Sequence, residues 1–178
     1  MRLPIADDPI LRENRRSELA RRLISHGVRT RNITKLTGLT RNRLATVRRR
    51  LMVGDKTRPR GPARSSLEIF LGTPRARSEG AALVCLCAAF EIPIDRNAAS
   101  LPAIVSLQFT ERLCETYEAF RACFPDTKIE LEELILLRNS IGNGDEVRLG
   151  SCRTCKGLIL LAPFEGTRRT CASCDTTG

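Results

Sequence analysis

The chain has 178 residues, of which 42% are apolar, and a net charge of +10. Its length suits one domain with small appendages, and its apolar content excludes a chain that is disordered by composition. No apolar run approaches the roughly 18 residues of a membrane helix, and the N-terminus lacks the charged start, apolar stretch and cleavage site of a signal peptide, so we expect a cytoplasmic protein with no membrane partner.

The first third of the chain, residues 1–53, predicts a helix-turn-helix region. A 3.6-residue apolar period begins at Arg16, with Ser17 as the N-cap, and ends at Gly27. A short second helix is expected over Thr30–Leu36. Gly38 then sits where the turn needs a positive φ.

A third helix is expected over Arg41–Met52, with Thr40 as its N-cap. Leu44, Val47 and Leu51 form its inner face. The order of helix, short helix, glycine-containing turn and helix is the plan of a DNA-binding helix-turn-helix.

The distribution of charge supports a polyanion-binding role for this region. Residues 1–64 carry 18 Lys and Arg against 5 Asp and Glu, a net charge of +13, whereas residues 65–178 carry a net charge of −3. Side chains that suit the edges of bases in a major groove are expected at Arg41, Asn42, Arg43, Thr46 and Arg49. Phosphate contacts are expected from Arg29, Arg31, Lys35, Arg48 and Arg50.

Residues 54–66 read as a basic linker rich in proline and glycine, whose Lys56 and Arg58 would follow the DNA backbone. The alternative for the whole N-terminal third is a small helical subdomain with a solvated basic face. Residues 67–144 predict a helical region, with helices over Ser78–Phe90, from Pro102 to Phe124, and over Glu130–Ile141, the last ended by Gly142 and Gly144. Four cysteines within these patterns are expected to fill the core: Cys85, Cys87, Cys114 and Cys123.

The segment 145–178 predicts short strands and a metal-binding knuckle. Cys152 and Cys155 form one C-x2-C pair, and Cys171 and Cys174 form a second one fifteen residues later. Two such pairs supply the four thiolates of a tetrahedral zinc site. Four protein ligands leave no open position for water, so the spacing indicates one structural Zn²⁺; iron in a rubredoxin-like site is the minor alternative. Gly157 is expected at the tight turn, and Leu158–Leu161 as one strand of a hairpin.

The sequence gives no sign of an enzyme. Its single histidine, His26, lies near the end of the first predicted helix, so a Ser/His/Asp set would depend on that residue alone. The chain contains neither a P-loop nor a G-x-G-x-x-G motif.

Two stretches carry a resemblance to a known family. The segment LGSCRTCKGLILLAPFEGTRRTCASC, from Leu149 to Cys174, resembles the zinc-binding end of the FlhC family of flagellar transcriptional activators. The segment ELARRLISHGVRTRNITKLTGLTRNRLATVRRRL is similar to that family's N-terminal part. The resemblance implies that the four late cysteines bind zinc. It also implies that the helical middle contacts an FlhD-type subunit, and that the hetero-oligomer activates flagellar operons through RNA polymerase.

From these features we expect a mainly α-helical protein that binds promoter DNA as an activator subunit. The alternatives are a zinc-ribbon RNA-binding protein and an adaptor whose basic helices bind an acidic protein. RNA-binding proteins more often expose aromatic side chains for stacking, and this chain has one Tyr, six Phe and no Trp.

Overall fold

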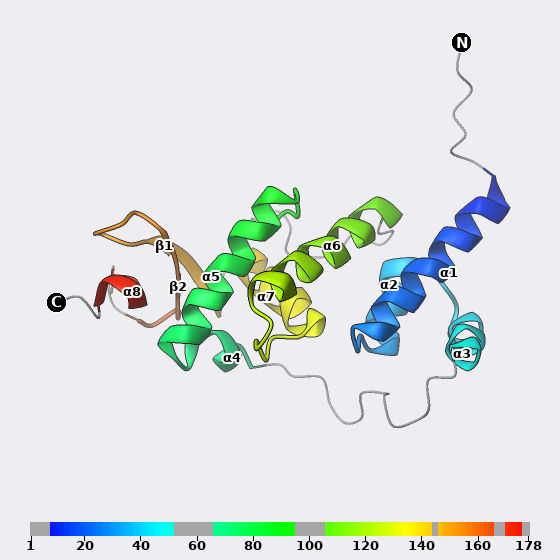
Figure 1. The fold of residues 1–178 in the computed structure, drawn as a ribbon, viewed down its shortest axis with the longest axis horizontal. Helices are drawn as coiled ribbons and strands as arrows, with labels where there is room; N and C mark the ends of the chain where they lie inside the picture. The colour runs from blue at the N-terminus through cyan, green and yellow to red at the C-terminus, as the bar shows by residue number, and fades with distance from the viewer. Residues whose placement is uncertain (1–7, 52–65, 95–105, 144–145, 166–169, 176–178) are drawn as a thin grey trace, which may run out of the picture. The chain divides into compact units, whose positions relative to one another are not determined.

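The computed structural model describes residues 8–51, 66–94, 106–143, 146–165 and 170–175, which form eight helices and one two-stranded sheet (Figure 1). The mainly helical fold with a small C-terminal cysteine cluster is as expected. The chain forms two compact units: an N-terminal unit of residues 1–61 and 102–114, and a C-terminal unit of residues 62–101 and 115–178. The segments 67–144 and 145–178 delimited from the sequence do not coincide with these units. No helix among the described residues is long and apolar enough to cross a membrane.

Helix α1, Pro9–Ser25, begins seven residues before the predicted start at Arg16. Asp8, not Ser17, is its N-cap, and its side chain accepts a hydrogen bond from the Ile10 amide at 2.8 Å. Pro9 occupies the first helical position, where its missing N–H costs nothing. The prediction was wrong because apolar periodicity marks only the part of a helix that is buried, and the first turns of α1 are largely exposed.

The turn between the second and third helices has the predicted geometry. Helix α2, Thr30–Thr37, ends at Gly38, which has φ 70° and donates its N–H to the Thr34 carbonyl at 2.9 Å. Thr40 then caps α3, Arg41–Arg50, by accepting from the Arg43 amide. The third helix ends at Arg50, so Leu51 lies at its C-cap and is 36% exposed rather than part of the inner face. Met52 lies outside the described residues.

The N-terminal unit packs α1, α2 and α3 against one another (Figure 1). The first part of α6, Leu107–Cys123, belongs to this unit as well. Thr110 donates its hydroxyl to the Leu36 carbonyl at 2.8 Å, and Glu111 forms an ion pair with Arg15 of α1. The core is made of buried aliphatic side chains: Leu19, Leu23, Ile24, Val28, Ile33, Leu36, Leu39, Leu44, Val47 and Leu113.

Three helices of the predicted middle region exist with shifted ends. Helix α5, Pro74–Ala89, begins four residues before Ser78 because Thr73 caps it, and a short helix α4, Glu68–Leu71, precedes it. Helix α6 begins after Ser106, whose hydroxyl oxygen accepts from the Phe109 amide at 3.1 Å, whereas Pro102, its predicted start, lies outside the described residues. Helix α7, Leu131–Asn143, continues through Gly142, whereas Gly144 lies outside the described residues.

The C-terminal unit places a β-hairpin against α5. Strands β1, Arg148–Ser151, and β2, Leu158–Leu161, are antiparallel, with Leu149 opposite Leu160. Strand β2 and the short helix α8, Ala172–Asp175, both pack on α5 (Figure 1). The hairpin predicted around Leu158–Leu161 is therefore present, and it is anchored to a helix some eighty residues earlier in the chain.

Two of the four helical cysteines are in the core. Cys87 and Cys114 are buried, as expected. Cys85 and Cys123 are exposed, so the expectation that they fill the core was wrong. In α5 the reason is the helical period, since residues two apart in a helix point to different faces.

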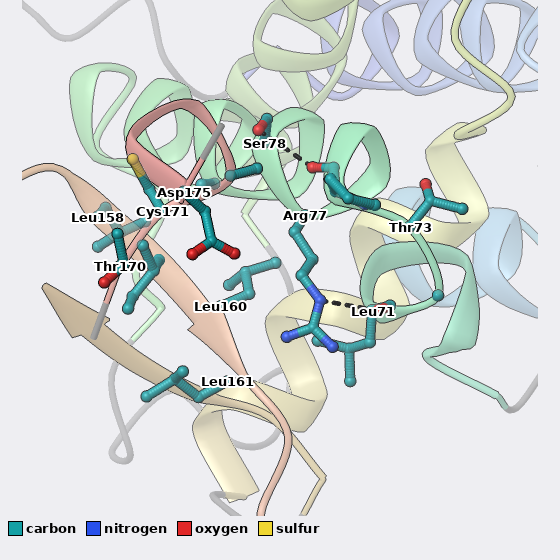
Figure 2. Close-up of a pocket in the computed structure, with 15 residues that line it drawn as sticks. Leu71, Thr73, Arg77, Ser78, Leu158, Leu160, Leu161, Thr170, Cys171 and Asp175 are labelled. Carbon is teal, nitrogen blue, oxygen red and sulfur yellow. Dashed lines mark hydrogen bonds between the residues drawn. The ribbon is translucent and has the colours of Figure 1, made fainter. Parts of the chain in front are cut away.

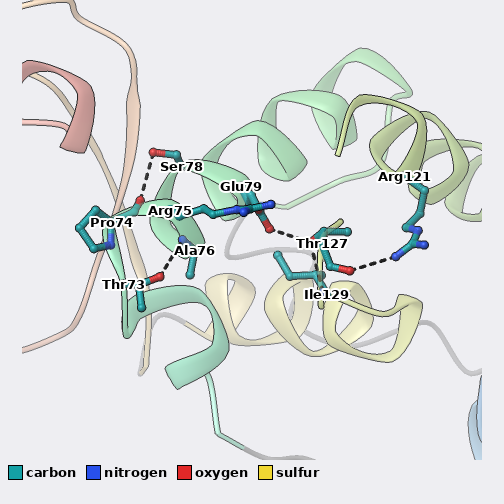
Figure 3. Close-up of polar contacts among 9 residues, drawn as sticks. All are labelled: Thr73, Pro74, Arg75, Ala76, Ser78, Glu79, Arg121, Thr127 and Ile129. Carbon is teal, nitrogen blue, oxygen red and sulfur yellow. Dashed lines mark hydrogen bonds and ion pairs between the residues drawn. The ribbon is translucent and has the colours of Figure 1, made fainter. Parts of the chain in front are cut away.

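A buried carboxylate connects α5 to the segment before α7 (Figure 3). Glu79, whose side chain is 8% exposed, accepts from the Arg75 guanidinium and from the Thr127 hydroxyl, each at 2.6 Å. Thr127 also accepts from the Ile129 amide, and the Thr127 carbonyl accepts from Arg121. Burial raises the pKa of Glu79, but the hydrogen bonds from Thr127 and Arg75 together lower it by more, so the net shift is downward.

We expect the C-terminal unit to lose stability in acid through Glu79. A folded-state pKa below the unfolded value of about 4.3 contributes stability above that pH, and the contribution is lost as the pH falls through the folded pKa. The free energy of unfolding, measured in urea across this pH range, should therefore fall less steeply with decreasing pH for Glu79→Gln than for the wild type. Thr127→Val, which removes one of the two hydrogen bonds, should lie between them. Equal slopes for all three proteins would contradict this role of Glu79.

Candidate metal centre and basic helices

Four cysteine sulfurs converge at the end of the C-terminal unit. The Sγ atoms of Cys152, Cys155, Cys171 and Cys174 all lie within 4.8 Å of one another, and those of Cys155 and Cys171 are 3.6 Å apart. A tetrahedral site with metal–sulfur bonds of about 2.3 Å has sulfur–sulfur edges of about 3.8 Å. The structure thus brings together all four residues chosen from the spacing, in an arrangement that could hold one metal ion.

The first cysteine pair lies on a tight turn between β1 and β2. Cys152 donates its amide to the Gly157 carbonyl at 2.8 Å, and its own carbonyl accepts from the Lys156 amide at 3.0 Å. Gly157 lies in this turn as expected, and Lys156 before it adopts the left-handed conformation, with φ 62°. A Cβ at Gly157 would lie 3.3 Å from the Cys155 sulfur, which is a tight contact.

The second pair completes the site from the start of α8. The Cys171 amide donates to the Cys152 sulfur at 3.2 Å. Hydrogen bonds from the Cys155 and Cys171 backbone lower the pKa of Cys152 to about 6. The pKa of Cys174 is raised to about 12, chiefly by its hydrogen bond with Cys171. A bound cation would favour the thiolate form of every ligand, so metal binding would release protons from the cluster.

An ion pair attaches the turn after β2 to α5. Both terminal guanidinium nitrogens of Arg77 contact the Glu165 carboxylate at 2.6 Å, and the Nε of Arg77 donates to the Leu71 carbonyl at 2.8 Å. Paired hydrogen bonds of this kind are among the stronger polar contacts. The two residues are 88 positions apart, and no sequence pattern indicated their pairing.

The third helix presents an open basic face. The side chains of Arg41, Asn42, Arg43, Arg49 and Arg50 are exposed, opposite buried Leu44 and Val47. Thr46 is half-buried and donates its hydroxyl to the Asn42 carbonyl at 3.2 Å. Arg43 lies 4.0 Å from the Glu13 carboxylate of α1.

The expected phosphate-binding residues divide into three groups. Arg31 and Lys35 of α2 are exposed, and Arg29 is half-buried at the N-cap of α2. Arg48 is half-buried, and two of its three guanidinium nitrogens, Nε and Nη2, are buried. Lys56 and Arg58 lie outside the described residues.

No protein-family model and no curated protein sequence matches this chain.

Proposed function

We propose that the chain is a DNA-binding transcriptional activator subunit of the kind found in the FlhC family. The observation that supports this most is the arrangement of α2, Gly38 and α3. A left-handed glycine sets the angle between two short helices, and the second helix turns a face of arginine and asparagine side chains to solvent. These side chains match guanine and adenine edges in a major groove, while Arg31 and Lys35 can meet the backbone.

We propose that the metal is zinc and that its role is structural. Four cysteine sulfurs at tetrahedral spacing fill the coordination shell of Zn²⁺ and leave no position for a substrate. The ion would hold the hairpin and α8 against α5. Elemental analysis of the purified protein should give one zinc per chain; a site loaded mainly with iron would contradict this assignment.

An FlhD-type subunit and RNA polymerase are the proposed protein partners. The composition of α5 supports a protein contact there, because no charged residue occurs from Gly80 to Phe90 although Cys85, Ala88 and Ala89 are exposed. An uncharged, exposed helix face in a chain of this charge is better suited to another protein than to water. With that partner the complex would switch on flagellar operons.

The test is DNA binding on a flagellar promoter and on random DNA of equal length, with and without the co-expressed FlhD-type subunit, over a series of salt concentrations. Selective binding that becomes stronger with the partner and falls steeply with salt supports the activator role. Equal weak binding to both DNAs, unchanged by the partner, contradicts it. Preference for RNA or for an acidic protein in the same assay would favour one of the alternatives.

Replacing Asn42 or Arg49 by alanine should reduce discrimination between the promoter and random DNA. Loss of one good bidentate base contact costs about 1–3 kcal/mol of specificity. Arg21→Ala is the matched control, since Arg21 is an exposed arginine of α1 that pairs with Glu18 at 3.0 Å. The control should retain discrimination. If Arg49→Ala weakens binding to both DNAs equally, Arg49 contacts phosphate and not a base.

A further inference from the structure

The four cysteines of the metal centre differ in their exposure to solvent. Cys155 is exposed, Cys171 and Cys174 are half-buried, and Cys152 is 0% exposed. The Cys152 sulfur is also held in place, because it accepts a hydrogen bond from the Cys171 amide at 3.2 Å. A small oxidant in solution therefore reaches Cys155 most readily among the four, since oxidation of cysteines follows their exposure.

A sulfur of the other C-x2-C pair lies close to Cys155. The Sγ atoms of Cys155 and Cys171 are 3.6 Å apart, and a disulfide bond is about 2.05 Å long, so the two atoms must approach by about 1.5 Å. Cys155 lies on the turn between β1 and β2, whereas Cys171 immediately precedes α8. A bond between the two sulfurs would therefore join two segments of the knuckle covalently.

Cys171 has free space on one side. It lines a pocket of about 260 Å³ formed by residues of α5, β2 and α8, with Ala81, Leu158 and Asp175 among its other lining residues (Figure 2). Side chains in a close-packed interior cannot shift without strain, whereas residues that line a cavity are less constrained. Cys171 is thus better placed than buried Cys152 to make the small movement that a disulfide with Cys155 requires.

We propose that Cys155 and Cys171 form an oxidation site, at which a hydroperoxide such as hydrogen peroxide converts the two thiolates into a disulfide and releases the metal. The proposal goes beyond the DNA-binding function and rests on the four-cysteine cluster alone. Oxidation would replace the metal cross-link of the knuckle by a covalent one, so that the hairpin and α8 remain attached to each other after the metal has left.

The reaction has two steps. The Cys155 thiolate attacks one peroxide oxygen: a sulfur–oxygen bond forms, the oxygen–oxygen bond breaks, and hydroxide leaves, which gives a sulfenic acid. The Cys171 thiolate then attacks the Cys155 sulfur, the disulfide forms, and a second hydroxide leaves. The two sulfurs lose two electrons and the peroxide gains them, while two protons from solvent convert the hydroxides to water. Only Cys152 and Cys174 remain as thiolates, too few to retain a tetrahedral metal ion.

The experiment treats the purified full-length chain with stoichiometric hydrogen peroxide and measures two quantities. A chromogenic chelator reports released zinc, and mass spectrometry of unreduced tryptic peptides, prepared after alkylation of free thiols, identifies the disulfide. Trypsin cuts after Arg153, so Cys152 and Cys155 fall in separate peptides, and fragmentation of the linked peptides distinguishes Cys171 from Cys174. We expect one zinc ion released for each disulfide formed, and a peptide pair that joins Cys155 to Cys171.

Protease resistance separates the covalent cross-link from simple loss of the metal. Peroxide-treated protein should resist cleavage within residues 146–175 for longer than protein stripped by a chelator in the presence of a reductant, although both lack zinc. The reason is that a disulfide restricts the unfolded segment, whereas chelation leaves it unrestrained. Cys123→Ser is the matched control, because Cys123 is an exposed cysteine outside the cluster, and this variant should behave as the wild type does.

A disulfide within either C-x2-C pair would overturn the proposal, and so would a sulfinic acid at Cys155 without any disulfide. In Cys171→Ser the Cys155 sulfenic acid should persist and react with dimedone; if Cys155 instead forms a disulfide with Cys174 as fast as the wild type forms its own, Cys171 is not the partner. The peptide map identifies the disulfide whatever metal the cluster holds. An error in the zinc assignment is therefore distinguishable from an error in this proposal.

Discussion

Replacing Cys171 by serine is expected to release the metal and unfold the hairpin and α8 from the C-terminal unit. Cys171 supplies one of four sulfurs, and its amide also donates to Cys152. Structural zinc contributes on the order of 10 kcal/mol to the folding of small metal-stapled segments. Strands of four residues each cannot bury enough apolar surface to replace that contribution.

Zinc content and limited proteolysis measure this effect. Cys171→Ser should contain little zinc and should be cleaved rapidly within residues 146–175, and a chelator should produce the same cleavage in the wild type. Cys123→Ser is the control, because Cys123 is an exposed cysteine outside the cluster and its loss should change neither readout. A Cys171→Ser variant with full zinc content and unchanged protease resistance would show that Cys171 is not a ligand.

Replacing Gly80 by alanine should destabilise the C-terminal unit, although the same change stabilises most helices. A glycine in a helix interior costs roughly 0.5–1 kcal/mol relative to alanine. Here an added Cβ would lie 2.6 Å from the Leu160 Cδ1 and 3.0 Å from the Phe70 Cδ1. Both neighbours are buried, at 2% and 0% exposure, so neither can move aside without disturbing the core.

The expected result for Gly80→Ala is a net loss of about 1–3 kcal/mol in the free energy of unfolding. Urea unfolding of the metal-loaded protein measures it. Ser78→Ala is the matched control on the same helix, because Ser78 is exposed and its hydroxyl donates only to the Pro74 carbonyl. The control should be neutral or slightly stabilising. A Gly80→Ala variant more stable than the wild type would show that β2 shifts easily on α5.

The features that sequence reasoning identified depend on residues close together in the chain. Thr40 caps α3 because its hydroxyl oxygen accepts from an amide three residues later. Gly38 ends α2 because glycine adopts a positive φ there without a steric cost. Cys152 and Cys155 are separated by two residues, so one turn brings both sulfurs to a single ion. Such signals can be read without knowing the fold.

The features that sequence reasoning missed depend on residues far apart in the chain or on local detail that spacing does not show. The start of α1 was not predicted because exposed helix turns carry no apolar period. Lys156, and not the glycine that follows it, takes the left-handed conformation in the turn between the strands. The burial of Nε and Nη2 of Arg48 depends on how the N-terminal unit packs.

The sequence by itself determined the mainly helical class, the helix-turn-helix pattern and the identity of the four clustered cysteines, because cap, turn and ligand spacing are set within short stretches of chain. Only the tertiary structure decided where the four-cysteine site is attached. The Arg77–Glu165 ion pair and the contact between Gly80 and Leu160 each join residues about eighty or more positions apart. Contacts of that kind form only when the whole unit has folded, so no local sequence pattern predicts them.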